Sequence, residues 1–216
     1  MSRHAVALHH VPKVRLLGAG MVATAGLALT GTGVLAGLNA EASNPHAESV
    51  TGGTLKLVMT DNGAGFRSAV SGLAPGDTVQ RYVDLANTGT LDGKALSLRA
   101  ADATPTLLTG DPTKGLHVTV TECSGAWSAT TGECAGSSTQ VLGDTPVSTL
   151  LAAPAALSSG DVTAGATRHL KVALTLPDQD ETTVNGMPPT TTVQGKTAAL
   201  TWTFTMTQRD GTTTGA

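Results

Sequence analysis

Residues 200–207, which read LTWTFTMT, alternate strictly between apolar side chains and threonine. Successive side chains of a β-strand point to opposite faces of the sheet, so a period of two marks a strand with one buried face. We therefore predict a core strand whose threonines face solvent or a neighbouring subunit. Its core-facing residues are Leu200, Trp202, Phe204 and Met206.

The same alternation occurs in shorter runs toward the N-terminus. Between residues 79 and 86, one face carries Val79, Val83 and Leu85 together with Arg81, which is an imperfect core position. Only 2% of the residues are aromatic, so we expect a core built from Leu, Val, Ala and Met. Further strands are predicted in residues 50–60, 95–99, 116–120 and 169–176.

These short strands are separated by Gly, Pro and Asp turns and do not alternate with long helices. The pattern predicts an all-β fold, specifically an antiparallel β-sandwich that is jelly-roll-like. An immunoglobulin-like strand order fits the same pattern, because strand order depends on non-local pairing. A short helix or irregular insert is expected in the middle of the chain, at residues 148–157, where Pro154 limits its length.

A tight turn is predicted at residues 74–77, which read APGD. Pro75 presets its own φ angle, Gly76 accepts the left-handed region, and Asp77 completes the turn motif.

The chain begins with basic residues, and no acidic residue precedes Glu41. An apolar stretch follows from Leu16 to Leu38, diluted by six glycines. This pattern is typical of a signal peptide cleaved after Ala36, with Ala42 as the later candidate and a retained membrane helix as the alternative. The predicted layout is a signal peptide at 1–36, a polar segment at 37–49, a β-sandwich domain at 50–209 and a polar tail at 210–216. We expect a secreted protein of the extracellular matrix or cell surface, without a permanent membrane anchor.

The formal net charge of the whole chain is −3. Because the basic front end leaves with the signal peptide, the mature part is more acidic than this value suggests. Nucleic-acid binding requires clustered Lys and Arg, so we expect no nucleic-acid partner.

The chain has two cysteines, Cys123 and Cys134. In an exported protein, an isolated pair of this kind predicts a disulfide that closes the Gly- and Ser-rich loop between them. Half of a metal site is the alternative, although no second Cys or His pair lies at ligand spacing.

Catalytic sequence motifs are absent: the chain has no HExxH, no GxSxG, no phosphate-binding loop and no dinucleotide fingerprint. His46, His117 and His169 are isolated from one another, and we interpret the last two as solvated surface residues. The acidic cluster of Asp178, Asp180 and Glu181 is interpreted as a charged turn, with a weak Ca²⁺ loop as the alternative. We therefore predict no catalytic, cofactor-binding or metal-binding residue.

Four segments resemble the TasA/camelysin family of secreted bacterial proteins, whose signal peptides are removed by a SipW-type peptidase. They are GTGVLAGLNAEAS (31–43), GGTLKLV (52–58), the long run from 70 to 100 that contains the PGD turn and an Asn-Thr-Gly, and VQGKTAALTWTFTMTQ (193–208). Residues 101–165 are unmatched, and the Cys123/Cys134 loop departs from the fibre-forming pattern. The resemblance implies a jelly-roll sandwich and, for many members, fibres in a biofilm matrix. Camelysin itself is described as a zinc metalloendopeptidase, so the resemblance also implies that activity.

The resemblance and the lack of catalytic motifs together favour a structural matrix protein that self-associates into fibres, with other matrix proteins as further partners. In this hypothesis a donor strand from residues 37–60 adds to the edge of the next subunit. The alternatives are a camelysin-like zinc metalloendopeptidase and a small surface adhesin that binds carbohydrate through exposed aromatics. Trp127 is the candidate contact of such an adhesin, with Tyr82 and Phe66 as scattered further aromatics.

Overall fold

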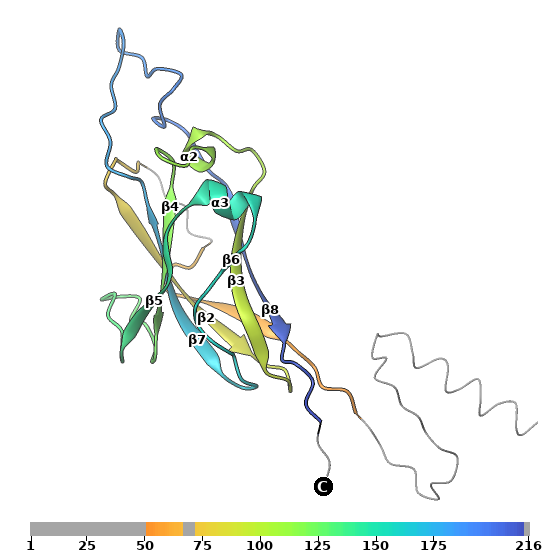
Figure 1. Cartoon of the computed structure of the whole chain (residues 1–216). Coiled ribbons are helices and arrows are strands. Elements are labelled where there is room, and N and C mark those ends of the chain that lie inside the picture. The colour runs from red at the N-terminus through yellow and green to blue at the C-terminus, as the bar shows by residue number, and fades with distance from the viewer. Residues whose placement is uncertain (1–50, 67–71, 214–216) are drawn as a thin grey trace, which may run out of the picture. The chain divides into compact units, whose positions relative to one another are not determined.

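Two antiparallel β-sheets of five and three strands pack against each other across one hydrophobic core (Figure 1). The computed structural model describes residues 51–66 and 72–213. The predicted signal peptide, its cleavage after Ala36 and the segment 37–49 lie outside the described residues. Within the described part of the chain, no helix has the length and apolarity needed to cross a membrane. The two packed sheets make the fold a sandwich, as the alternating patterns predict.

The five-stranded sheet has the order β1-β2-β7-β4-β5. Leu85, Val120 and Val172 lie on its inner face and are fully buried, because every second residue of β2, β4 and β7 points inward. Arg81 lies on the same inner face, where it lines a cleft described below. The strands are β1 (Leu57–Asn62), β2 (Thr78–Asn87), β4 (His117–Cys123), β5 (Ser138–Pro146) and β7 (Thr167–Thr175).

The three-stranded sheet has the order β6-β3-β8, with β3 (Gly93–Asp102) between β6 (Ala155–Ala156) and β8 (Leu200–Gln208). A register shift between Lys94 and Ser97 interrupts the pairing of β3 with β8, and Ala95 there has a φ of 53°. Beyond this shift Leu98 pairs with Phe204, and both side chains pack in the core.

The strand order explains why the fold is close to a jelly roll without being one. A jelly roll winds up a long hairpin of about eight strands, so that the first strand pairs with the last and each inner strand with its counterpart. Here β2 pairs with β7, β3 with β6 and β4 with β5. However, β1 pairs with β2 instead of β8. The pair of first and last strands is missing among the described residues, so the predicted jelly-roll order is not confirmed.

Two short helices cover one end of the core. Helix α3 (Val147–Ala152) overlaps the segment predicted as helical but begins one residue before it. The helix ends before Pro154, and residues 155–156 form β6. Helix α2 (Leu107–Gly110) was not predicted. Thr106 caps it: its Oγ1 accepts a hydrogen bond from Leu108 N, and Thr106 N donates to Thr109 Oγ1.

Residues 74–77 form a tight turn at the start of β2. Asp77 N donates to Ala74 O at 3.0 Å, and Gly76 has a φ of 87°, which suits the third position of a type II turn. Gly76 N also donates to Leu176 O at 2.8 Å, so the turn is fixed to the end of β7.

Candidate functional site: the open edge of strand β8

Strand β8 is the border of the three-stranded sheet. It pairs with β3 along one side, and no strand within residues 51–66 or 72–213 pairs with its other side (Figure 1). The backbone groups on that side have no partner strand in the described part of the chain. Such an edge is a template for pairing with another chain.

The edge of β8 lacks the features by which proteins block strand addition. Residues 200–208 contain no charged residue and no proline. The other borders of the two sheets differ: β1 carries Asp61, β5 carries Asp144 and ends at Pro146, and β6 has two residues. Of the described strand edges, β8 is therefore the one best suited to accept a strand.

The apolar side chains of β8 are only half-buried. Leu200, Trp202, Phe204 and Met206 pack against the core, whereas Thr201, Thr203, Thr205 and Thr207 are exposed. The faces are those predicted from the alternation, but the burial is lower because β8 has a neighbour on one side only.

An apolar cleft opens between the sheets where β8 begins. Its volume is about 730 Å³. Phe66 and Trp202 form part of its wall, with ring centroids 5.7 Å apart and an interplanar angle of 28°. Aliphatic side chains supply most of the remaining wall, including Leu108, Leu116, Leu174, Leu176 and Val193. The space beside the first half of β8 is therefore lined by core-type side chains.

Glu181 lies at the rim of this cleft. Its carboxylate accepts hydrogen bonds from Thr192 Oγ1 and Gln194 Nε2. The hydrogen bond from Thr192 holds the pKa of Glu181 below its usual range. Because these partners precede β8, Glu181 fixes the loop that leads into the open strand.

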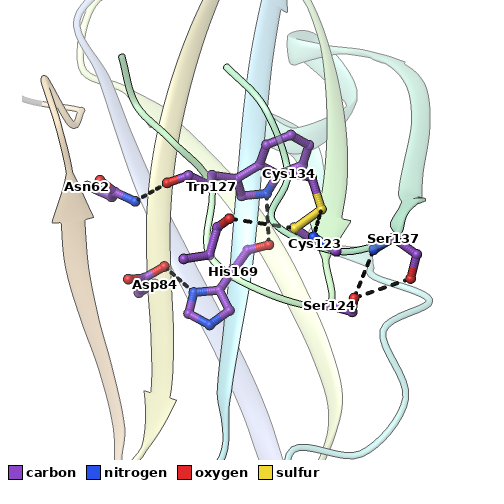
Figure 2. Close-up of a disulfide and its surroundings, with 10 residues drawn as sticks. Asn62, Asp84, Cys123, Ser124, Trp127, Cys134, Ser137 and His169 are labelled. Carbon is purple, nitrogen blue, oxygen red and sulfur yellow. Dashed lines mark hydrogen bonds and ion pairs between the residues drawn. A yellow bond between two sulfur atoms is a disulfide. The ribbon is translucent and has the colours of Figure 1, made fainter. Parts of the chain in front are cut away.

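The Cys123–Cys134 disulfide closes a loop that folds back over the outer face of the five-stranded sheet (Figure 2). The two Cα atoms are 5.7 Å apart, within the range of ordinary disulfides. The bond agrees with the prediction from the isolated cysteine pair. A disulfide of this kind fits a protein that works outside the cytoplasm.

Trp127 is the buried centre of the Cys loop. Its side chain is 5% exposed, and its Nε1 donates to His169 O at 3.1 Å (Figure 2). The ring packs on Tyr82 with a centroid distance of 5.9 Å, and Lys171 Nζ lies 4.4 Å from its centroid. Trp127 is therefore not an exposed carbohydrate platform, and the expectation that it serves an adhesin in this way is wrong.

The histidines in the described residues are paired, not solvated. His117 Nδ1 contacts Asp144 Oδ2 at 2.9 Å, and His169 Nδ1 contacts Asp84 Oδ1 at 2.7 Å. The side chains of His117 and His169 are 16% and 24% exposed. The expectation of solvated side chains is therefore wrong for both. His46 lies outside the described residues.

Comparison with known proteins places the chain in a family. The sequence model of the family described as Camelysin metallo-endopeptidase matches residues 13–213. The chain belongs to this family. No curated protein matches the chain. Camelysin membership agrees with the resemblance found in the sequence, and the match also includes residues 101–165, which the sequence comparison had left unmatched.

The described residues of this camelysin-family chain do not fit a peptidase metal centre. A protein-bound catalytic metal needs about three protein ligands. In residues 51–66 and 72–213, His, Cys, Asp and Glu form no group of three or more that could hold a metal ion. The two His–Asp contacts are pairs, and Asp178 and Asp180 are exposed residues that do not complete a Ca²⁺ loop with Glu181.

Asn87, in the Asn-Thr-Gly of residues 70–100, has a structural role that the sequence did not predict. It is fully buried and hydrogen-bonded to three backbone groups. The Asn-Thr-Gly that follows a predicted strand was the available signal, but its long-range partner could not be read from the sequence.

Proposed function

We propose that this protein is a secreted structural component of the extracellular matrix, which assembles with copies of itself by strand addition. The open edge of β8 carries this proposal. Main-chain hydrogen bonds to a donor strand would supply affinity there, and the cleft beside β8 would accept alternate side chains of the donor.

Strand addition at β8 would also complete the sheet. In a jelly roll the first strand lies beside the last, and β1 does not occupy that place among the described residues. A donor strand there would cover the half-buried side chains of Trp202 and Phe204. Each Å² of apolar surface removed from water contributes about 25 cal/mol.

The donor segment is narrower than residues 37–60. Residues 57–62 form β1 and pair with β2, and residues 54–56 bond to the loop after β2 through Thr54 O and Lys56 O. The donor that we propose is therefore residues 37–53, which signal-peptide cleavage would leave at the N-terminus. Because the donor and the acceptor edge differ, the contact is head-to-tail, and it propagates into filaments when the rotation between subunits does not close a ring.

Electron microscopy of the mature chain tests the proposal. We expect filaments from the mature chain and monomers from a variant that lacks residues 37–53. A variant in which a Gly/Ser segment of the same length replaces residues 37–53 separates the effect of donor sequence from that of chain length. Filaments from all three proteins would refute the proposed donor.

Metal-dependent proteolysis is the second candidate, and the description of the matching family favours it. Metal analysis of the mature protein and a casein assay with and without chelator separate the two candidates. Chelator-sensitive casein cleavage by purified protein, retained when assembly is blocked, would establish the peptidase.

A further inference from the structure

A second cleft, of polar character, lies at the opposite end of the sandwich from the apolar cleft. Leu116, the residue just before β4, lines the apolar cleft, and β4 ends at the polar cleft with Glu122 and Cys123. The polar cleft has a volume of about 370 Å³. Pockets of about 300–1,000 Å³ are typical of small-molecule sites.

Hydroxyl groups and one ion pair line this polar cleft. Arg168 Nη1 contacts Glu122 Oε1 at 2.8 Å, and the side chains of Arg168 and Glu122 are 26% and 13% exposed. Since these opposite charges neutralise each other, the cleft favours a neutral ligand over an anion or a cation. The hydroxyl-bearing residues are Ser124, Ser137, Thr139, Ser158, Ser159 and Thr167.

Two polar atoms of residues that line the cleft have no hydrogen-bond partner within the described part of the chain. They are Ser159 Oγ and Arg168 Nε, both of which are buried. Ser159 as a whole is 9% exposed. Buried polar groups in folded proteins are almost always hydrogen-bonded, so the two unpartnered atoms call for a partner from outside the described chain. The cleft that Ser159 and Arg168 line is the side from which a ligand or solvent can approach them.

We propose that this polar cleft binds a neutral mono- or disaccharide. Sugar hydroxyls both donate and accept hydrogen bonds, as the serine and threonine hydroxyls of the cleft do. In this assignment Glu122 accepts a hydrogen bond from a sugar hydroxyl, and Arg168 and Ser159, which line the same cleft, offer donors to the sugar oxygens. Val141 is the aliphatic side chain in the lining, which leaves little surface for an apolar ligand.

If the polar cleft binds a sugar, the disulfide loop contributes to the binding site, because it forms part of the cleft wall. Cys123 lines the cleft, and Ser124 and Ser137 form the adjoining wall through a bond from Ser124 N to Ser137 O at 2.9 Å. Ser137 N also donates to Ser124 Oγ at 3.0 Å. The Cys123–Cys134 bond therefore fixes the wall of the polar cleft as well as the position of Trp127.

Titration calorimetry of the monomeric mature chain tests this assignment. The probes are glucose, galactose, mannose, N-acetylglucosamine and their disaccharides, with glucuronic acid and sialic acid as charged controls. We expect at least one neutral sugar to bind, and Glu122→Gln to weaken its binding by about tenfold, the effect of one charge-assisted hydrogen bond.

The Ser159→Ala variant separates a loss of sugar binding from a loss of folding. Its hydroxyl has no partner among residues 51–66 and 72–213, so the variant should melt like the parent while its sugar binding weakens. Thr182→Ala, an exposed position outside the cleft, should change neither property. The assignment is overturned if no neutral sugar binds, if only the charged sugars bind, or if Ser159→Ala and Glu122→Gln bind like the parent.

Discussion

Asn87 and Val162 are joined by a 2.9 Å hydrogen bond from Asn87 Nδ2 to Val162 O, although 75 positions separate them. Asn87 Nδ2 also donates to Leu91 O at 2.8 Å, and its Oδ1 accepts from Gly89 N at 3.1 Å. Val162 in turn bridges to Gly93 at the start of β3. Asn87 therefore ties the end of β2 in one sheet to the start of β3 in the other.

Replacing Asn87 should be costly, because two backbone carbonyls and one amide would lose a buried partner. We expect Asn87→Ala to lower the free energy of unfolding by about 2–4 kcal/mol. Urea unfolding of the mature chain measures this loss. Thr88→Ala, at the exposed next position, is the control and should lie within about 0.5 kcal/mol of the parent. If Asn87→Ala has the same free energy of unfolding as the parent, the hydrogen bonds of Asn87 do not contribute to holding the two sheets together.

Trp127 should be more important for stability than its place in a surface loop suggests. Its ring is buried against Tyr82 and Lys171, so Trp127→Ala should destabilise the protein by about 3–5 kcal/mol. Lys171→Ala removes only the cation above the ring and should cost about 1 kcal/mol. Thermal melts of both variants under oxidising conditions make the comparison. If the Trp127 variant is no less stable than the Lys171 variant, the loop does not anchor on the sheet.

Opening the disulfide should release the same loop. A loop of this length contributes about 2–3 kcal/mol in the chain-entropy model. We expect the Cys123→Ser/Cys134→Ser double variant to lose that amount of stability and to expose Trp127. Fluorescence in a Trp202→Phe background reports Trp127 alone, since the chain has two tryptophans. An unshifted emission maximum in the double variant would mean that the loop stays docked without the bond.

Trp202 is half-buried at an open edge, which lowers the expected cost of removing it. A fully buried aromatic residue costs about 3–5 kcal/mol when it is replaced by alanine. We expect Trp202→Ala to cost about 2–3 kcal/mol in the monomer, because it loses its stacking with Phe66 and part of its core contact. Thr203→Ser should change stability by less than about 1 kcal/mol, since Thr203 is exposed. If thermal melts show that Thr203→Ser is more destabilising than Trp202→Ala, the assignment of Trp202 to the core-facing side of β8 is wrong.

The features that the sequence predicts best are those set by local periodicity. β7 and β8 keep an unbroken period of two, so their inward faces follow from the pattern alone. β5 was missed because register shifts against β4 place the adjacent residues Val141 and Leu142 in the core together. The open edge of β8 could not be predicted from the sequence, because it depends on the non-local pairing of β1 with β2 instead of with β8.

Asp111 should make the protein less stable in acid. Its Oδ1 accepts hydrogen bonds from Thr113 N at 2.8 Å and Lys114 N at 2.9 Å. The bond from Lys114 N, followed by that from Thr113 N, holds the pKa of Asp111 below its ordinary value of 3.8. A lowered folded-state pKa contributes stability that is present above 3.8 and is lost as the pH falls through the folded-state pKa.

Asp111→Ala should therefore melt at a lower temperature than the parent at neutral pH, by an amount equivalent to about 1 kcal/mol or less. The difference should shrink as the pH falls below 3.8. Melts over a pH series measure it, with exposed Asp178→Ala as the matched carboxylate control. A difference that stays constant across the series would show that the charge of Asp111 does not matter.

Hydrogen–deuterium exchange of assembled and monomeric protein tests the central claim most directly. If a donor strand adds to β8, alternate amides within residues 200–208 should become protected on assembly, because the amides on the open edge acquire carbonyl partners. The amides on the free borders of β1 and β5 should exchange at the same rate in both states. Protection gained at β1 or β5 with β8 unchanged would contradict assembly through the edge of β8.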